Sequence, residues 1–377
     1  MTERNIAVGR SADDGNDHDW AARSEFWRTH TPAQIGPGRR KKFKYREPLI
    51  LCGHGIQIRI DHGTLHIRNG FTHYPQKSEQ IRFFPGDANL PDRIILLDAS
   101  GSVSFDALNW MSEQTIELVQ LNWKGEAISV AGNSGYCANS ILVEAQKSAK
   151  AGAANLRIAR WLIAEKFESS ILTLENAIPK SEIREAAISR IKNRIFEIRN
   201  MRNLISISSL LGIEGICAAA YFKAWQGLPI NWTRNKRKPI PDNWREIGPR
   251  VMGWRYNSRN ARQPFNAMLN YGYGILASQM RKQVVAAGFD PAIGVMHGNK
   301  DNRIPLVYDL MEPLRPVADR AILKFALSHK FVPGDFTINK WGGCRLNPQL
   351  AKSLVGQIAL DNEPGTMVRK FQAALQK

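Results

Sequence analysis

The spacing of apolar residues changes once along this 377-residue chain, and the change limits the folds that are open to it. Over residues 46–131 apolar and polar residues alternate, as at Ile56 and Ile58, which is the period of a half-buried strand. Turn-forming residues occupy 132–136, and over 137–345 the spacing becomes three to four, which is typical of helices. The chain is therefore predicted to be α+β: a strand-rich domain, a short linker, and a second domain that is all-helical or nearly so.

Local signals predict details of the strand-rich domain. The sequence DHG at 61–63 separates two alternating runs and predicts the turn of a β-hairpin. Ser104 suits the N-cap of a short helix, because its hydroxyl can accept a first-turn amide. Further strands are expected at Ile94–Leu97, Glu117–Leu121 and Ala127–Val130.

In the helical domain, Ser181 follows Pro179 and is expected to open a helix whose apolar face carries Ile191 and Ile195. The other helices are expected at about 137–166, 204–225, 257–284 and 309–330.

The two ends of the chain show no comparable pattern. Residues 1–45 are polar, and we expect them to form a basic, disordered extension. The run RRKKFKYR at 39–46 suits phosphate contact with base stacking, or it is simply a solvated linker. Residues 346–377 are interpreted as a C-terminal tail.

The charge of the chain indicates its partners. Lys and Arg total 52 against 34 Asp and Glu, a formal net charge of +18, which favours a polyanion such as nucleic acid over a neutral small molecule. No stretch approaches the roughly 20 apolar residues that a membrane span needs, and the polar start lacks the apolar core of a secretory signal. We expect no membrane association and a cytoplasmic location.

The four cysteines, Cys52, Cys137, Cys217 and Cys344, stand far apart and form no CxxC pair. They therefore indicate neither a zinc knuckle nor a disulfide framework.

Glu214 is an unusual carboxylate. If LISISSLLGIEGICAAAYF is a helix, its neighbours one turn away include Leu210, Leu211, Cys217 and Ala218, so it rises from an apolar face. A charge there needs a cation, hydrogen bonds or a raised pKa. Metal or catalytic use and a structural ion pair both remain open.

A second cluster contains His297, Asp309 and Glu312. The two acidic residues lie three apart, on one face at the start of an expected helix, and His297 lies in a glycine-containing loop before them. Each signal is weak alone, because helix starts favour acidic residues for dipole reasons and a loop histidine is often only a surface residue.

The combination of the two clusters is more informative than either one. One histidine and two or three carboxylates from separate helices make a nitrogen and oxygen site that suits Mg²⁺ or Mn²⁺. In a strongly basic chain, a metal held this way suits cleavage or transfer of a phosphodiester.

These residues stand in motifs that resemble the CRISPR-associated integrase and endonuclease family Cas1. The resemblance covers roughly residues 46–345 and rests on three motifs in order: LLGIEG, RNARQPFNAMLNYGYGIL and MHGNKDNRIPLVYDLMEPLRP. It implies a β-sandwich-like N-terminal domain, a C-terminal all-helical catalytic domain, and a homodimer.

The resemblance also implies roles for individual residues. Glu214, His297 and Glu312 match the family's metal ligands, and Asp309 matches an aspartate that supports the site, so these four are the expected catalytic residues. Tyr273 is expected to brace the site rather than to take part in chemistry. The implied reaction inserts a short double-stranded DNA, the prespacer, at a CRISPR repeat by attack of a 3′-hydroxyl, with Cas2 as the protein partner in a prokaryotic cytoplasm.

The DNA-binding residues expected from the sequence are basic residues before the NAML stretch: Arg234, Lys236, Arg237, Lys238, Arg255, Arg259 and Arg262. A solvated charged face is the alternative interpretation of such a run.

Two rival functions remain on the same scaffold. A transposon-type integrase would carry the same motifs. A catalytically silent DNA-bridging protein would keep the fold, but it has no need of buried carboxylates.

Overall fold

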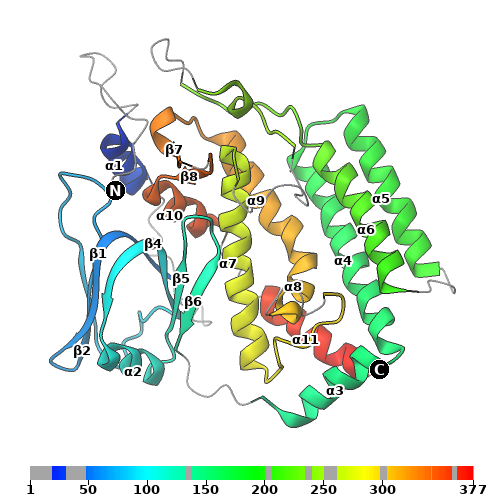
Figure 1. Ribbon diagram of the computed structural model, residues 1–377, viewed down its shortest axis with the longest axis horizontal. Coiled ribbons are helices and arrows are strands. Elements are labelled where there is room, and N and C mark those ends of the chain that lie inside the picture. Colours follow the sequence, from blue (N-terminus) through cyan, green and yellow to red (C-terminus); the bar gives the residue numbers. More distant parts are fainter. Residues whose placement is uncertain are drawn as a thin grey trace.

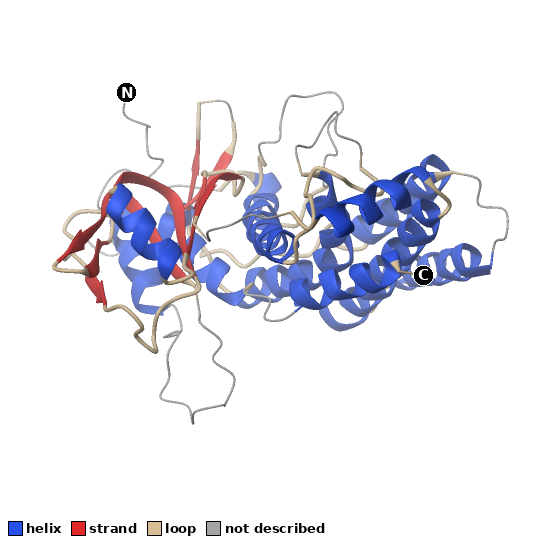
Figure 2. Cartoon of the chain, turned by 90° about the horizontal axis from the view of Figure 1, so that it is seen from below, coloured by secondary structure: helices blue, strands red, loops and turns tan. Residues whose placement is uncertain are grey.

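The computed structural model describes residues 19–30, 48–132, 138–200, 206–233, 240–249, 261–297, 304–340, 342–358 and 363–376. The large sheet lies at one end of the molecule and most of the helices lie at the other, with α7 (Pro264–Ala286) beside the sheet (Figures 1 and 2). The α+β class and the order of the two parts are confirmed. Within the described ranges, no helix is both long and apolar enough to cross a membrane.

The strands of the N-terminal part form one mixed sheet in the order β3-β2-β1-β4-β5-β6. Strand β1 pairs in parallel with β4, and β4 in parallel with β5, while the other pairs are antiparallel. The strands are β1 (Leu49–Asp61), β2 (Thr64–Arg68), β3 (Gln80–Phe83), β4 (Arg93–Val103), β5 (Glu117–Leu121) and β6 (Ala127–Ala131).

The hairpin and the helix cap predicted for this part are confirmed. Strands β1 and β2 are joined by His62 and Gly63, whose φ angles of 48° and 74° are those of a type I′ turn. The Ser104 hydroxyl accepts the Ala107 amide at 3.2 Å and caps α2 (Phe105–Glu113).

Helices cover both faces of the sheet. In β1, Ile50 and Cys52 belong to the core shared with the helical part, whereas Leu51 packs in a second core with residues of α2. Helix α10 (Pro348–Gln357) lies against β1 and β4 on the first of these faces. The sheet is therefore attached to the helical part through a continuous apolar core.

The helical part is built around three neighbouring helices, α4, α5 and α6, of which α4 also contacts α9 and the short segment η2 (Figure 1). Its helices are α3 (Ser140–Ala151), α4 (Ala154–Ala177), α5 (Glu182–Asn200), α6 (Ile207–Lys223), α8 (Pro305–Met311) and α9 (Arg315–Ser328), with 3-10 segments η1 (Asp242–Trp244), η2 (Glu312–Leu314) and η3 (Pro333–Asp335). A hairpin of β7 (Phe336–Ile338) and β8 (Cys344–Leu346) also lies in this part, so it is not purely helical.

Two helices that were expected to be continuous are broken. The stretch predicted at 137–166 divides at Gly152, where α3 ends, and α4 continues to Ala177. The stretch predicted at 309–330 divides at η2, because Pro313 and Pro316 remove amide donors and disfavour helical backbone at the preceding residues.

The expected disorder at the N-terminus is wrong for α1 (Trp20–His30). Arg23 and Trp27 of this helix both bond to Asp335, more than 300 residues away in the sequence. The partner that orders the helix is therefore invisible in the local sequence. Residues 1–18 and 31–47, with the basic run, lie outside the described residues.

The expected C-terminal tail is likewise part of the folded core. Helix α10 packs on the sheet, and α11 (Glu363–Leu375) buries Met367 and Phe371 and contacts α7 and α8. The predicted domain boundary at residue 345 therefore does not separate these helices from the core. Most of the predicted linker, 133–136, lies outside the described residues.

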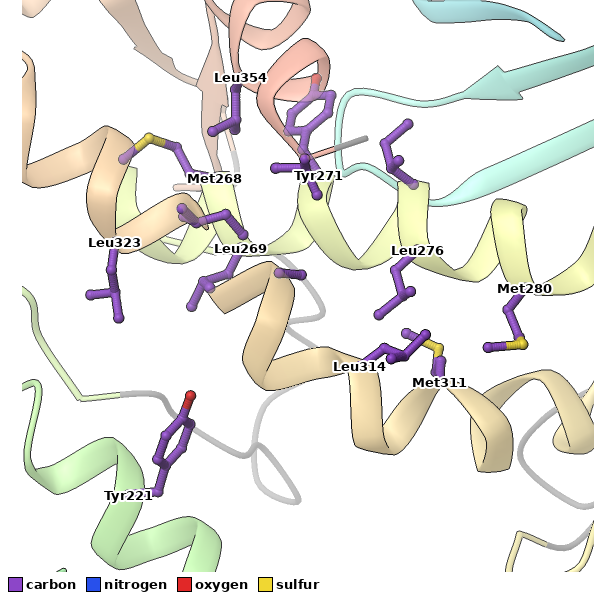
Figure 3. Packing of buried hydrophobic residues seen from close by; sticks show 14 of the residues in the cluster. Tyr221, Met268, Leu269, Tyr271, Leu276, Met280, Met311, Leu314, Leu323 and Leu354 are labelled. Carbon is purple, nitrogen blue, oxygen red and sulfur yellow. The ribbon is translucent and has the colours of Figure 1, made fainter. Parts of the chain in front are cut away.

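Packing of α7 on the α8–η2 segment holds the position of Glu312. Leu276 of α7 points toward Met311 and Leu314, which lie on either side of Glu312 and Pro313 in the sequence (Figure 3). Met311 and Leu314 are both buried. The residues that flank Glu312 and Pro313 are thus held in the apolar core.

Candidate metal and active site

Two of the predicted carboxylates meet at one ammonium group. Lys166 of α4 donates from Nζ to Glu312 Oε2 at 2.6 Å and also to Glu214 Oε1. The three side chains are 14%, 7% and 19% exposed, in the order Lys166, Glu312 and Glu214. Helices α4 and α6 and the segment η2 therefore bring one lysine and two glutamates together at a site that is partly accessible to solvent.

The apolar face predicted for Glu214 is present. Leu210, Cys217 and Ala218 are buried around it, although the Glu214 side chain itself keeps some access to solvent. The structure shows Glu214 in an ion pair, which was one of the two alternatives. The other alternative, metal or catalytic use, stays open, because Glu214 shares its cation with Glu312, a second predicted ligand.

A second cation holds Glu312 from its other oxygen. Arg315 Nη2 forms an ion pair with Glu312 Oε1 at 3.1 Å, and its guanidinium lies 5.2 Å from the ring centroid of Tyr273. The Tyr273 hydroxyl donates to Asp319 at 2.6 Å, and the Tyr221 hydroxyl donates to the other Asp319 oxygen at 3.0 Å. This agrees with the bracing role expected for Tyr273.

Burial and the two cations compete in setting the charges of the site. Burial alone would raise the pKa of Glu312, but Arg315 and Lys166 outweigh it and lower that pKa to about 2. Burial alone would lower the pKa of Lys166, but Glu312 and Glu214 outweigh it, so that pKa is raised. Glu312 is thus a carboxylate and Lys166 an ammonium at neutral pH.

Asp309 organises the loop that carries His297. Its side chain is fully buried and accepts the amides of Val295, of Met296 at 3.0 Å and of His297 at 3.1 Å. It also accepts from His297 Nδ1 at 2.6 Å, and this hydrogen bond raises the pKa of the imidazole. Both Asp309 oxygens are occupied, so this residue orients the histidine and is not available as a ligand.

The side chains suit a divalent metal in part. Nowhere in the described ranges do three His, Cys, Asp or Glu side chains converge closely enough to hold an ion as they stand. The two carboxylates nevertheless share one cation, and their oxygens are donors that Mg²⁺ and Mn²⁺ prefer. Because Nδ1 of His297 is bonded to Asp309, only Nε2 can be a ligand, and a metal-bound histidine is commonly oriented by a carboxylate in this way.

Lys166 was missed from the sequence, although a signal was present. It lies one turn from Leu162, Ile163 and Ser170, all of them buried, just as Glu214 lies among apolar residues. A lysine on an apolar helix face needs an acidic partner for the same reason that Glu214 needs a cation. Each of the two unusual charges therefore indicates a partner of opposite sign elsewhere in the chain.

The predicted DNA-binding residues are mostly outside the described part of the chain. Arg234, Lys236, Arg237, Lys238, Arg255 and Arg259 all lie there. Arg262 is described and exposed at the approach to α7. The placement of this basic run relative to the carboxylates therefore stays a prediction.

The fold is similar to those of solved structures. A casposase bound to an integration product is 25% identical, has a TM-score of 0.65, and is matched over 83% of this chain and 82% of its own. A Cas6-RT-Cas1–Cas2 complex contains a chain that is 18% identical with a TM-score of 0.67, matched over 92% of this chain and 36% of its own. The second likeness shows the fold alone.

The family follows from the sequence. Residues 49–359 match the family model described as CRISPR associated protein Cas1, and the chain belongs to this family. It is similar to a CRISPR-associated endonuclease Cas1 of Methanospirillum hungatei, with 34% identity over 155 residues, which are 41% of each chain. Matches to the first three curated relatives cover 41%, 32% and 33% of those proteins.

Proposed function

We propose that this protein is a metal-dependent DNA integrase and endonuclease that inserts short DNA fragments into a CRISPR array. Glu214, His297 and Glu312 would hold Mg²⁺ or Mn²⁺. The observation that carries the proposal is the meeting of Glu214 and Glu312, from different helical elements, at a single cation. It occurs in a member of the Cas1 family with a net charge of +18, which favours a polyanionic substrate.

In the proposed site some residues bind the metal ion and others position the side chains that bind it. Glu214 and Glu312 supply carboxylate oxygens, and Arg315 keeps Glu312 ionised from the side opposite to Lys166. Asp309 holds the backbone and Nδ1 of His297, and it is therefore a positioning residue. Tyr273 and Tyr221 fix Asp319, and Tyr273 also lies against the Arg315 guanidinium.

The proposed reaction is a phosphodiester exchange. A 3′-hydroxyl of the incoming DNA gives up its proton and attacks phosphorus at the target, so that a new oxygen–phosphorus bond forms. The bond to the target 3′-oxygen breaks, and that oxygen takes up a proton, so the step involves no net change in protons. A divalent ion bound at the site would stabilise the charge on the phosphoryl oxygens. The basic residues, including Arg262, would hold the backbones of both duplexes.

The proposed partners are double-stranded DNA, a second copy of the chain, and Cas2. The casposase solved with an integration product supports DNA as a partner by similarity, and Cas2 is proposed from membership of the Cas1 family. The homodimer is proposed from the family resemblance, and a cytoplasmic location is proposed with it.

The test is integration of a short duplex with free 3′-hydroxyls into a supercoiled plasmid carrying a CRISPR repeat. The full-length protein is assayed with Mg²⁺ or Mn²⁺, with and without Cas2. Integration that needs the metal and disappears in Glu214→Ala and His297→Ala, while DNA binding remains, supports the proposal. Activity that survives both substitutions contradicts it.

The likeness to the casposase favours a second candidate, an integrase that inserts the ends of a mobile element. Both candidates use the same site, and they differ in the DNA they accept. Sequencing of the products separates them: insertion at a repeat boundary indicates the CRISPR function, whereas a preference for element ends as donor indicates the other.

A further inference from the structure

The carboxylates proposed as metal ligands already share a cation that belongs to the chain. Lys166 is the only residue of α4 that bonds to Glu214 or Glu312 among the described contacts, and it bonds to both. Its ammonium lies where two negative side chains of different elements come together. Removal of this charge without replacement would leave the carboxylates facing each other.

Glu312 has a second cationic partner besides Lys166. Glu312 is bonded to Lys166 through Oε2 and to Arg315 through Oε1. Arg315 would therefore continue to compensate Glu312 if Lys166 moved away. The lysine side chain is 14% exposed and has four flexible methylene groups, so it has both an opening and the freedom to move.

We propose that Lys166 is a positioning residue that keeps Glu214 and Glu312 together in the metal-free protein and is displaced when a divalent ion binds between them. The inference rests on the proposed metal site. In this proposal the metal ion and the Lys166 ammonium compete for Glu214 and Glu312, because the ion can bind both carboxylates only after the ammonium has left them. Metal affinity is then set partly by a residue that is not a ligand.

A purely structural ion pair predicts a different response to substitution. If Lys166 serves only to hold α4, α6 and η2 together through its ion pairs, its loss destabilises the protein whether or not metal is present. If it is displaced by the ion, its loss destabilises the metal-free form, and the ion restores the stability. Metal affinity and metal-dependent stability therefore distinguish the two roles without any assay of DNA integration.

The experiment measures Mn²⁺ binding by calorimetry and thermal unfolding in chelator and in saturating Mn²⁺, on the full chain. For Lys166→Met we expect a Mn²⁺ dissociation constant that is lower by about tenfold or more, because the competing cation is gone. We also expect a lower Tm in chelator and a larger rise of Tm with Mn²⁺ than in the wild type. Lys166→Gln should behave similarly, and Lys166→Arg should keep weak binding.

The matched control is Lys282→Met. Lys282 is 18% exposed and bonds to a carboxylate, Asp92, at 3.3 Å, but it lies outside the proposed site. Its removal should leave Mn²⁺ affinity unchanged. Glu214→Gln tests the site itself and should weaken Mn²⁺ binding strongly.

Each result decides one of the two proposals. An unchanged or weaker Mn²⁺ affinity in both Lys166→Met and Lys166→Gln, or their failure to fold even with saturating Mn²⁺, overturns the displacement of Lys166. Equal Mn²⁺ affinity in the wild type and Glu214→Gln overturns the metal site instead. Tight binding by the neutral variants together with loss of binding in Glu214→Gln supports both.

Discussion

Two clusters of buried charge lie in different parts of the molecule and are built differently. In the first, beside α1, Asp335 is fully buried and accepts from Arg23 at 2.9 and 3.1 Å, from Trp27 Nε1 at 2.7 Å and from the Val332 amide at 2.9 Å. Both oxygens are occupied, and the donor side chains of Arg23 and Trp27 are buried. In the second, Glu214 and Glu312 share Lys166, and the Glu214 side chain remains 19% exposed.

The difference is the one expected between a structural ion pair and the proposed metal site. Burial raises the pKa of Asp335 in spite of the hydrogen bonds from Arg23, whereas Arg315 and Lys166 together lower the pKa of Glu312 against the effect of burial. The first cluster surrounds one fully buried carboxylate with buried donors that occupy both of its oxygens. In the second, Arg315 and Lys166 keep Glu312 ionised, and the partly exposed Lys166 also pairs with Glu214.

The largest effect should come from Glu214→Gln, which removes a charge from the open cluster without changing its size. We expect integration to fall by about 1000-fold or more, equivalent to about 4 kcal/mol in the barrier, because a ligand is lost. The free energy of unfolding should change much less, since the side chain is partly solvated. Single-turnover integration and urea denaturation of the same preparation measure both quantities. A large loss of stability with normal activity would show that Glu214, like Asp335, has a structural role, and it would contradict the proposed metal site.

The opposite result is expected for Asp335→Asn. The amide leaves Arg23 without its counter-charge in a closed environment, which should cost about 3 kcal/mol of unfolding free energy. Integration per folded molecule should stay at the wild-type level, because the cluster lies away from the carboxylates. Urea denaturation gives the first quantity, and activity at a temperature where the variant is folded gives the second. Stability equal to the wild type would remove the assigned structural role.

The sequence predicts the parts of this comparison that local spacing encodes. Alternation located β1, β2, β4, β5 and β6, and Glu214 was recognised because it interrupts an apolar face. His297, Asp309 and Glu312 gained their importance from the resemblance to the Cas1 family. Local patterns carry such information because one strand or helix face is set by neighbours within a few residues.

What the sequence does not predict depends on distant partners. Residues 1–45 are predicted to be disordered because they are polar and have no apolar period. Helix α1 is ordered because Arg23 and Ser24 are buried against partners from the other end of the chain. Lys166 was missed because Glu214 and Glu312 are 48 and 146 residues away. Opposite charges on apolar faces of separate helices show that partners exist, but they do not show which partners meet.

A smaller effect is expected from Asp309→Asn, which tests the orientation of His297. An amide can no longer accept from all three backbone amides and from Nδ1, so the loop and the imidazole should lose their fixed position. We expect Mn²⁺ affinity to fall by about 10- to 100-fold. Calorimetry measures it, with Asp290→Asn as the control, because Asp290 accepts the Ala292 amide in the same loop. An unchanged affinity in Asp309→Asn would contradict the positioning role.

The smallest effect is expected from Lys192→Met. Lys192 and Glu175 form an ion pair at 3.8 Å between α5 and α4, with side chains 59% and 42% exposed. Solvent already compensates both charges, so the unfolding free energy should change by less than about 0.5 kcal/mol, and Mn²⁺ affinity should not change. Thermal and urea denaturation beside Lys166→Met and Lys282→Met give a series in which the same charge is removed at three exposures. A loss as large as that of Lys166→Met in chelator would mean that charge alone determines the effect. We instead expect the loss of stability to decrease from Lys166→Met to Lys282→Met to Lys192→Met, because it depends on the burial of each ammonium and on the number of carboxylates that it contacts.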